Sequence, residues 1–152
     1  MIRLSRMADY AVLLMTTIAR DPNSVHAALT MAEAMSLPVP TVSKVLANMA
    51  RDGLLESIRG RDGGYRLARA PEAISVEQII SAVDGPIALT VCIEHGPGSC
   101  GLENCCPSRV NWRRINDAMS QALAGVSLAE IAVPALPPSV ELSRVAAATG
   151  TG

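Results

Sequence analysis

The sequence has almost no aromatic residues and a single lysine. Its 152 residues include one Trp, two Tyr and no Phe. A buried core therefore has to be built from Ala, Val, Leu, Ile and Met, a palette that favours helices over sheets. All the basic residues except Lys44 are arginines, which favours bidentate contacts to phosphate or guanine over simple charge attraction. The length predicts one compact domain with room for an appended helix or tail.

The sequence also contains no long hydrophobic run and no secretory signal. Met1-Ile2-Arg3 leads directly into a charged amphipathic segment, and no apolar run reaches membrane-spanning length. We therefore expect a cytoplasmic protein. Disulfides are disfavoured in that compartment, so the four cysteines crowded between residues 92 and 106 are expected to be metal ligands or redox groups.

The small net charge of −1 conceals an uneven distribution along the chain. Residues 1–70 carry nine Lys and Arg against six Asp and Glu, whereas residues 71–152 carry four against eight. A basic first half and an acidic second half are consistent with DNA contact by one part of the chain only.

Helical periodicity dominates the first fifty residues. Apolar residues at helical spacing predict a helix over residues 4–20. Thr30 and Glu33 have the spacing of a capping box, which predicts that a short helix starts at Thr30. A further helix is expected from Pro40 to Asp52, because proline is favourable in a first turn and a glycine follows.

The helix expected over residues 40–52 has one apolar face and one small, basic face. Its inward residues are predicted to be Val42, Val45, Leu46 and Met49. Its outward residues are predicted to be Thr41, Ser43, Lys44, Ala47, Asn48 and Arg51. Two short helices with this second face are typical of a helix-turn-helix, whose second helix enters the major groove. The alternative is an ordinary helical hairpin with a solvated face.

Two short alternating segments follow, and they predict a β-hairpin. Residues 54–58 and 65–69 read as strands around a turn rich in Gly and Arg. A hairpin directly after a recognition helix is the wing of a winged helix. Arg59 and Arg61 at its tip suit a minor groove or the phosphate backbone. The alternative is a glycine-rich turn with solubilising charges.

The second half of the chain combines helices with a cysteine-rich segment. Ser75 is expected to cap a helix, and residues 90–107 are a loop by composition. A helix is expected from Pro107 to about Ala124. Its apolar stripe at three- and four-residue spacing comprises Trp112, Ile115, Met119, Ala122 and Val126. This stripe either packs on the chain's own core or pairs two copies, and we favour a homodimer because two-fold dimers read palindromic sites.

Together these segments predict a mainly α fold with a small β-hairpin wing, that is, a winged helix-turn-helix plus a long dimerisation helix. We expect a DNA-binding domain over residues 1–86 and a cysteine-rich cluster-binding loop over 87–107. A dimerisation helix region is expected over 108–132 and a flexible tail over 133–152.

Four stretches of the chain resemble a known family. They are LSRMADYAVLLM, LPVPTVSKVLANMARDGLL, SIRGRDGGYRLAR, and the cysteine loop followed by a helix containing Trp112. Over roughly residues 1–132 the chain resembles the winged-helix regulators of the IscR and NsrR type (the Rrf-type family), nearest to those of the SUF iron–sulfur assembly system. The resemblance implies a homodimer that binds double-stranded operator DNA and senses a bound iron–sulfur cluster, [2Fe-2S] or [4Fe-4S].

The resemblance also implies a ligand set. The three cluster cysteines of the family match Cys92, Cys100 and Cys106, and the spacing to Trp112 matches Cys106 rather than Cys105. From the residues alone the cysteines leave three alternatives open: a cluster, a zinc site completed by His95, and free thiols.

The fourth ligand departs from part of the family. IscR-type members have a histidine three residues after the third cysteine, where this chain has Arg109, which is no normal ligand. His95, Glu94 and Cys105 lie in the loop but not at that position. NsrR-type members take a ligand from an N-terminal aspartate of the partner subunit, and Asp9 is the matching residue. The alternative for Asp9 is a solvated or Arg-paired carboxylate.

The function expected from these features is that of a regulator, not an enzyme. We expect a repressor of iron–sulfur cluster assembly or iron-homeostasis genes. Its predicted DNA-contacting residues are Thr41, Ser43, Lys44, Asn48, Arg51, Arg59 and Arg61. Some relatives have a glutamate at the position of Ser43, which tunes the operator class accepted.

Four alternative functions remain. One is a zinc- or thiol-redox-responsive regulator, and another is a nitric oxide sensor of the same family. A small redox enzyme using Cys100 or the Cys105-Cys106 pair is disfavoured, because no Cys-x-x-Cys and no catalytic His/Asp pairing is visible. The last is a winged helix used only for protein contacts.

Overall fold

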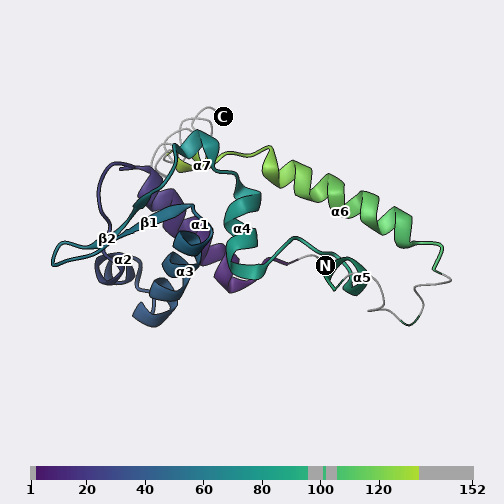
Figure 1. Cartoon of the computed structure of the whole chain (residues 1–152), viewed down its shortest axis with the longest axis horizontal. Coiled ribbons are helices and arrows are strands. Elements are labelled where there is room, and N and C mark those ends of the chain that lie inside the picture. The colour runs from purple at the N-terminus through teal and green to yellow at the C-terminus, as the bar shows by residue number, and fades with distance from the viewer. Residues whose placement is uncertain (1–2, 96–100, 102–105, 134–152) are drawn as a thin grey trace, which may run out of the picture.

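A computed structural model describes residues 3–95, 101 and 106–133 of the chain. Its helices and strands, in chain order, are α1 (Arg6–Ala19), α2 (Ala28–Met35), α3 (Val39–Arg51), β1 (Leu55–Ile58), β2 (Gly64–Leu67), the 3-10 helix η1 (Pro71–Ala73), α4 (Val76–Asp84), α5 (Val91–Glu94), α6 (Arg109–Ala124) and α7 (Leu128–Ala132). Figure 1 shows two parts: a body that contains α1–α4 and the hairpin, and α6, which extends away from it. This is the mainly α, winged-helix architecture that the sequence predicts.

The core of the body is aliphatic, as the shortage of aromatic residues requires. Its fully buried side chains come from α1, α3, α4, α7 and the segments between them. The largest are Leu14, Met15, Ile18, Leu46, Met49, Leu54, Ile74, Ile79 and Leu128. α1 lies at the centre and contacts α3, α4 and α7, while α2 packs against α3. The predicted inward face of α3 is confirmed, since its four apolar residues are all fully buried.

The start of α1 is tied to the end of α4. The Ser5 hydroxyl oxygen caps α1 by accepting a hydrogen bond from the Ala8 N–H at 3.0 Å. The same hydroxyl donates to Asp84 Oδ1 at 2.7 Å. α4 begins at the predicted cap Ser75, which forms a capping box with Gln78. These contacts fix the first helix against the last helix of the winged-helix body.

The predicted capping box at Thr30 and Glu33 is wrong. α2 begins at Ala28, two residues earlier, with Ala27 as a cap that makes no side-chain hydrogen bond. The cause lies elsewhere in the chain: His26 pairs with Tyr65 of β2, through N–H to oxygen distances of 2.8 and 2.9 Å. This bridge holds the backbone extended up to Ala27, and the helix begins directly after it.

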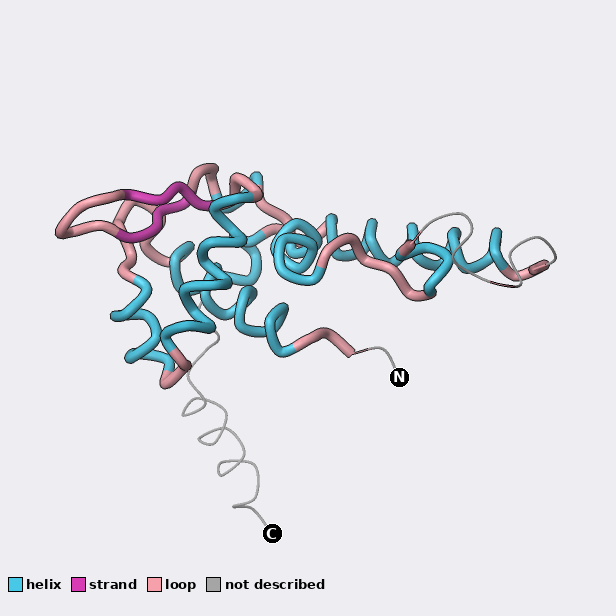
Figure 2. The backbone as a smooth tube through the Cα atoms, turned by 60° about the horizontal axis from the view of Figure 1, so that its bottom comes forward, coloured by secondary structure: helices cyan, strands magenta, loops and turns pink. Residues whose placement is uncertain are grey.

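The wing is a two-stranded antiparallel hairpin in which Leu55 lies opposite Leu67 and Ile58 lies opposite Gly64. The His26 bridge adds a short third segment beside β2. Figure 2 shows the hairpin at one end of the body, with its turn protruding. The predicted hairpin is therefore confirmed, with each strand one residue shorter than expected and the second strand beginning one residue earlier.

Two short helices in the second half were not expected. α5 lies within the stretch predicted to be a loop, and α7 follows the predicted long helix. α7 begins with a capping box between Ser127 and Glu130, and Leu128 is fully buried in the core. Hydrogen bonds from the Ser127 backbone N–H and hydroxyl lower the pKa of the Glu130 carboxyl. Val126, placed on the apolar stripe of the long helix, lies beyond its end at Ala124.

The helices formed by residues 3–95 and 106–133 include none with the length and apolar character needed to cross a membrane. Residues 134–152, where the sequence predicts a tail, lie outside the described residues.

Candidate DNA-binding surface and cysteine site

α3 presents the polar face that the sequence predicts for a recognition helix. Lys44 and Arg51 are exposed, whereas Thr41, Ser43 and Asn48 are half-buried. The helix has Pro40 in its first turn, and Gly53 follows it with a φ of 74°, a left-handed conformation that glycine adopts without strain. Its apolar side is locked into the core, so the polar side points outward.

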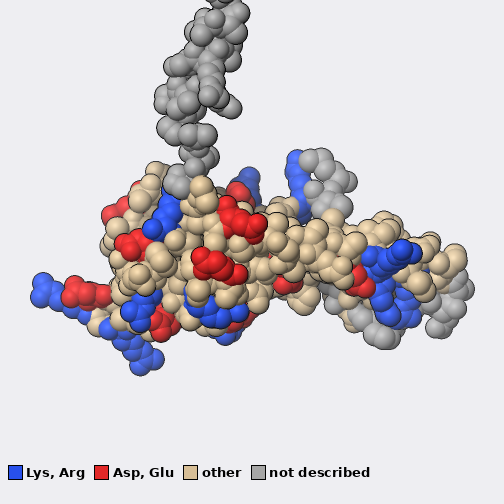
Figure 3. Space-filling view, turned by 90° about the horizontal axis from the view of Figure 1, so that it is seen from above, with Lys and Arg blue, Asp and Glu red and all other residues tan. Residues whose placement is uncertain are grey.

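The wing carries the second group of predicted DNA contacts. Arg59 and Arg61 are both exposed in its turn. Arg66 is engaged differently, because it donates to Glu56 on the opposite strand at 2.6 Å and forms an ion pair with it. Of the arginines in the wing, Arg59 and Arg61 in the turn are therefore the ones we assign to DNA contact. Figure 3 shows Lys and Arg side chains gathered at this end of the body and a second group over α6.

α3 and the wing form one continuous region. The Leu54 N–H donates to the Met49 carbonyl at 2.9 Å, which turns the chain directly from α3 into β1. The predicted DNA-contacting residues of the helix and of the turn are therefore brought to the same end of the molecule, away from α6 (Figures 1 and 2).

Two of the three predicted cluster cysteines lie in described segments. Cys92 is in α5 and Cys106 lies just before α6, and both are half-buried free thiols. The Thr90 hydroxyl lies 3.2 Å from Cys92 Sγ, within hydrogen-bonding distance for sulfur. Cys100 and Cys105 lie outside the described residues.

The remaining ligand candidates are separate from this pair. Asp9 is exposed in the first turn of α1, and His95 is exposed directly after α5. Within residues 3–95, 101 and 106–133, no three His, Cys, Asp or Glu side chains lie close enough to hold a metal ion. The donor chemistry nevertheless fits an iron–sulfur cluster, because such clusters take thiolates and both described thiols are free.

One functional candidate was missed by sequence reasoning. Asn116 of α6 is buried, with 6% of its surface exposed. Its side-chain amide hydrogen-bonds the backbone of Ile87 and Leu89, in the segment that leads to Cys92. No local sequence signal marks this residue, because its partners are 27 and 29 positions away.

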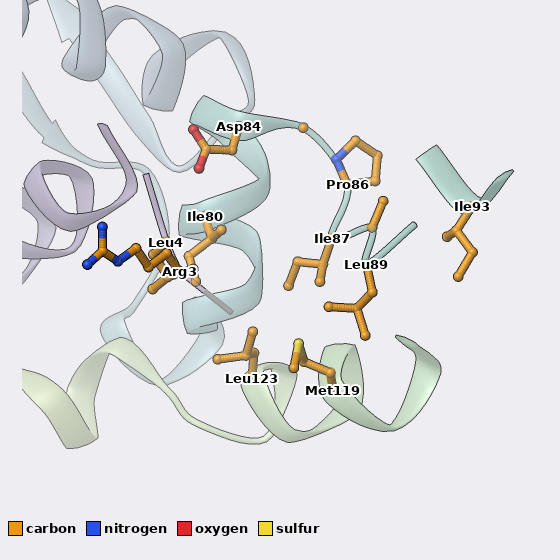
Figure 4. A pocket seen from close by; sticks show the side chains of 12 residues that line it. Arg3, Leu4, Ile80, Asp84, Pro86, Ile87, Leu89, Ile93, Met119 and Leu123 are labelled. Atoms are coloured by element: carbon orange, nitrogen blue, oxygen red, sulfur yellow. The ribbon is translucent and has the colours of Figure 1, made fainter. Parts of the chain in front are cut away.

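A mainly apolar cavity of about 450 Å³ lies between α4, the segment that follows it, the chain's first described residues and α6. Figure 4 shows Ile80, Ile87, Leu89, Met119 and Leu123 around it, with Asp84 at the edge. Met119 and Leu123 belong to the stripe side of α6, so this helix borders an apolar space that the described residues leave unfilled.

Comparison with known proteins decides the family. The model of the Rrf2 family, described as "Iron-dependent Transcriptional regulator", matches residues 4–134. The chain belongs to the Rrf2 family.

Rrf2 relatives cover most of this chain. The regulator IscR of Aliivibrio salmonicida is 31% identical over 132 residues, which span 86% of this chain and 77% of that protein. IscR of Erwinia tasmaniensis is 30% identical over 85% of this chain and 78% of its own length. The solved structure of CymR, the global cysteine regulator of B. subtilis, is 28% identical, with a TM-score of 0.70 over 87% of this chain and 97% of that one.

These findings confirm the predicted Rrf-type winged-helix regulator. The relatives are named as transcriptional regulators, and regulators of this family bind DNA. The cluster, the homodimer and the individual DNA-contacting residues remain predictions.

Proposed function

We propose that this Rrf2-family chain is a cytoplasmic, non-enzymatic repressor of iron–sulfur cluster assembly or iron-homeostasis genes. It binds double-stranded operator DNA as a homodimer, and an iron–sulfur cluster held by Cys92, Cys100 and Cys106 sets its DNA affinity. The observation that carries the sensing part is the pair of half-buried free thiols, Cys92 and Cys106, in an Rrf2 chain similar to IscR.

The chain's own residues have separate tasks in this proposal. Cys92 binds from α5 and Cys106 from the entry of α6, so one group held by both would join the two helices. A bound cluster would supply iron and sulfide that oxygen or nitric oxide can attack, and its assembly would depend on the iron supply. The Thr90 hydroxyl is placed to donate a hydrogen bond to the Cys92 sulfur, one of the ways in which proteins tune such sites. Asp9 is exposed and free to reach a partner subunit as fourth ligand.

Homodimer formation is supported by the surface of α6. Val110, Trp112 and Ile115 are 77%, 41% and 49% exposed in the single chain. Large apolar side chains left exposed along one helix mark an interface. Because Met119 and Leu123 of the same helix border the apolar cavity, antiparallel pairing of two α6 helices would bring Trp112 of one copy near the cavity of the other.

DNA binding by this chain is supported by the shared location of α3 and the wing. Lys44, Asn48 and Thr41 can reach base edges or phosphates from α3. Arg59 and Arg61 extend the surface to the neighbouring groove or backbone.

The decisive experiment is anaerobic purification followed by visible spectroscopy and analysis of iron, sulfide and zinc. We expect a brown protein containing iron and sulfide, bleached by Cys92→Ala. Cys105→Ala is the matched control, because it removes a neighbouring thiol outside the implied ligand set, and it should keep the colour. A colourless protein with stoichiometric zinc would remove the cluster from the proposal.

The free thiols of Cys92 and Cys106, in a chain that is also similar to a global cysteine regulator, favour a second candidate, in which the thiols themselves respond to oxidation without a cluster. In that case the metal-free protein would lose or gain operator affinity on treatment with peroxide, and Cys92→Ala would abolish the response.

A further inference from the structure

α6 buries one residue, and that residue is polar. Of its 16 residues only Asn116 is buried, while Trp112 and Ile115 on the preceding turn keep 41% and 49% of their surface exposed. Among all the residues that the structure describes, Asn116 is also the sole buried polar or charged side chain. A buried amide at the one point where a helix is enclosed needs an explanation, because burying polar atoms is costly unless they are hydrogen-bonded.

The explanation lies in two hydrogen bonds to the backbone of the segment that follows α4. Asn116 Nδ2 donates to the Ile87 carbonyl at 2.9 Å, and the Leu89 N–H donates to Asn116 Oδ1 at 3.0 Å. Ile87 and Leu89 are two residues apart, so the amide pairs with this backbone as a neighbouring β-strand would. We call residues 87–89 the clamped segment.

The clamped segment leads directly to the predicted ligand. Thr90 follows it, occupies the N-cap position of α5 and places its hydroxyl 3.2 Å from Cys92 Sγ. Only Thr90 and Val91 therefore separate the last clamped backbone group, that of Leu89, from Cys92. Since Asn116 lies on α6, the clamp connects the position of Cys92 to the helix that begins just after Cys106.

We propose that Asn116 is a positioning residue that fixes the place of Cys92 by holding the clamped segment against α6. It touches neither the thiol nor any group bound there; it acts through the backbone of Ile87 and Leu89. Losing both hydrogen bonds leaves a part-buried N–H and carbonyl without their partner, which favours release of the clamped segment. Cys92 would then leave its half-buried place more often.

The first test is the alkylation rate of each thiol in the reduced, metal-free, full-length protein, followed by peptide mass spectrometry after iodoacetamide treatment. In Asn116→Leu we expect Cys92 to react about tenfold faster, the factor that corresponds to two lost hydrogen bonds of modest net strength. The ratio of the Cys92 rate to the Cys106 rate should rise, because general loosening would accelerate both thiols alike.

The matched control is Gln121→Leu, which removes an exposed amide from the same helix. It should leave the ratio unchanged. If Asn116→Leu fails to fold, Asn116→Asp takes its place, since it keeps the acceptor for the Leu89 N–H and loses the donor to Ile87; we expect a smaller rise. A folded Asn116 variant whose Cys92 reacts at the wild-type rate would overturn the proposal.

A second readout rests on the proposed function. If the anaerobic protein is brown, Asn116→Leu should lose its colour in air several-fold faster than Gln121→Leu, and equal rates would count against a role of the clamp at the ligand. A colourless wild-type protein would refute the cluster only, because the alkylation ratio still decides the role of Asn116.

Discussion

At the scale of single residues, Gly64 is required because another part of the backbone passes too close to leave room for a side chain. Gly64 lies where β2 meets the His26 bridge. A Cβ atom added there would lie 2.4 Å from the His26 carbonyl oxygen and 2.7 Å from its carbon. Both obstacles are backbone atoms, so they cannot rotate away. This glycine is required by the contact between the wing and the connection from α1 to α2.

We expect Gly64→Ala to lower the free energy of unfolding by about 2 kcal/mol, the range typical of overpacking. Urea denaturation followed by circular dichroism measures this change. Gly125→Ala is the control, because its nearest atom would be Gln121 O at 3.4 Å, and it should shift stability by less than about 0.5 kcal/mol. Equal losses in the two variants would contradict the account of the bridge.

At the scale of secondary-structure elements, α3 and the wing were predictable because their signals are local. The inward residues of α3 recur at helical spacing, and the hairpin is marked by its glycine-rich turn. The start of α2 was not predictable, because the bridge between His26 and Tyr65 overrides the capping signal at Thr30. α7 did carry a usable signal, the Ser127–Glu130 capping box.

At this scale we predict that Lys44→Ala with Arg59→Ala lowers operator affinity about 100-fold, because each removes one cationic contact to DNA. Fluorescence anisotropy on a duplex selected from random sequences measures this, and the salt dependence should weaken by about two counterions. Arg114→Ala removes an exposed charge from α6, away from α3 and the wing in Figure 1, and serves as the control. Unchanged affinity in the double variant would refute the surface as drawn.

At the scale of the whole molecule, α6 is a helix that stays mostly exposed within one chain: of its 16 residues only Asn116 is buried. It projects from the body in Figure 1, and its large apolar residues are exposed. Its C-terminal end, which lies near the body in Figure 1, leads into α7, where Leu128 enters the core. α6 is thus fixed at its C-terminal end and held in its middle by Asn116, and it keeps exposed apolar side chains that, under the proposed function, pack against a second copy.

We expect Trp112→Ala with Ile115→Ala to convert the protein from dimer to monomer, because these side chains are 41% and 49% exposed in the single chain. Light scattering coupled to size exclusion would show the mass of one chain in place of two. Asp117→Ala, an exposed polar position on the same helix, should stay dimeric. A wild-type protein with the mass of one chain would remove the homodimer from the proposed function.

Some residues of the candidate site were predictable from the sequence, and others became visible only in the structure. The sequence and its family resemblance name Cys92 and Cys106, and the structure describes both as free thiols. Neither the sequence nor the family resemblance could reveal Asn116, because its hydrogen-bond partners are backbone atoms nearly thirty residues away. Periodicity predicted an apolar stripe on α6, but it could not show that the buried position on that helix is Asn116.

By itself the sequence determined the number and order of the main helices, the wing and the Rrf-type family, because periodicity, turn residues and motifs are properties of neighbouring residues. Tertiary structure alone decided where α2 begins, that α7 rejoins the core, and that α6 holds the segment before Cys92. Each of these depends on hydrogen bonds or burial between residues far apart in the chain, and local propensity contains no information about such partners.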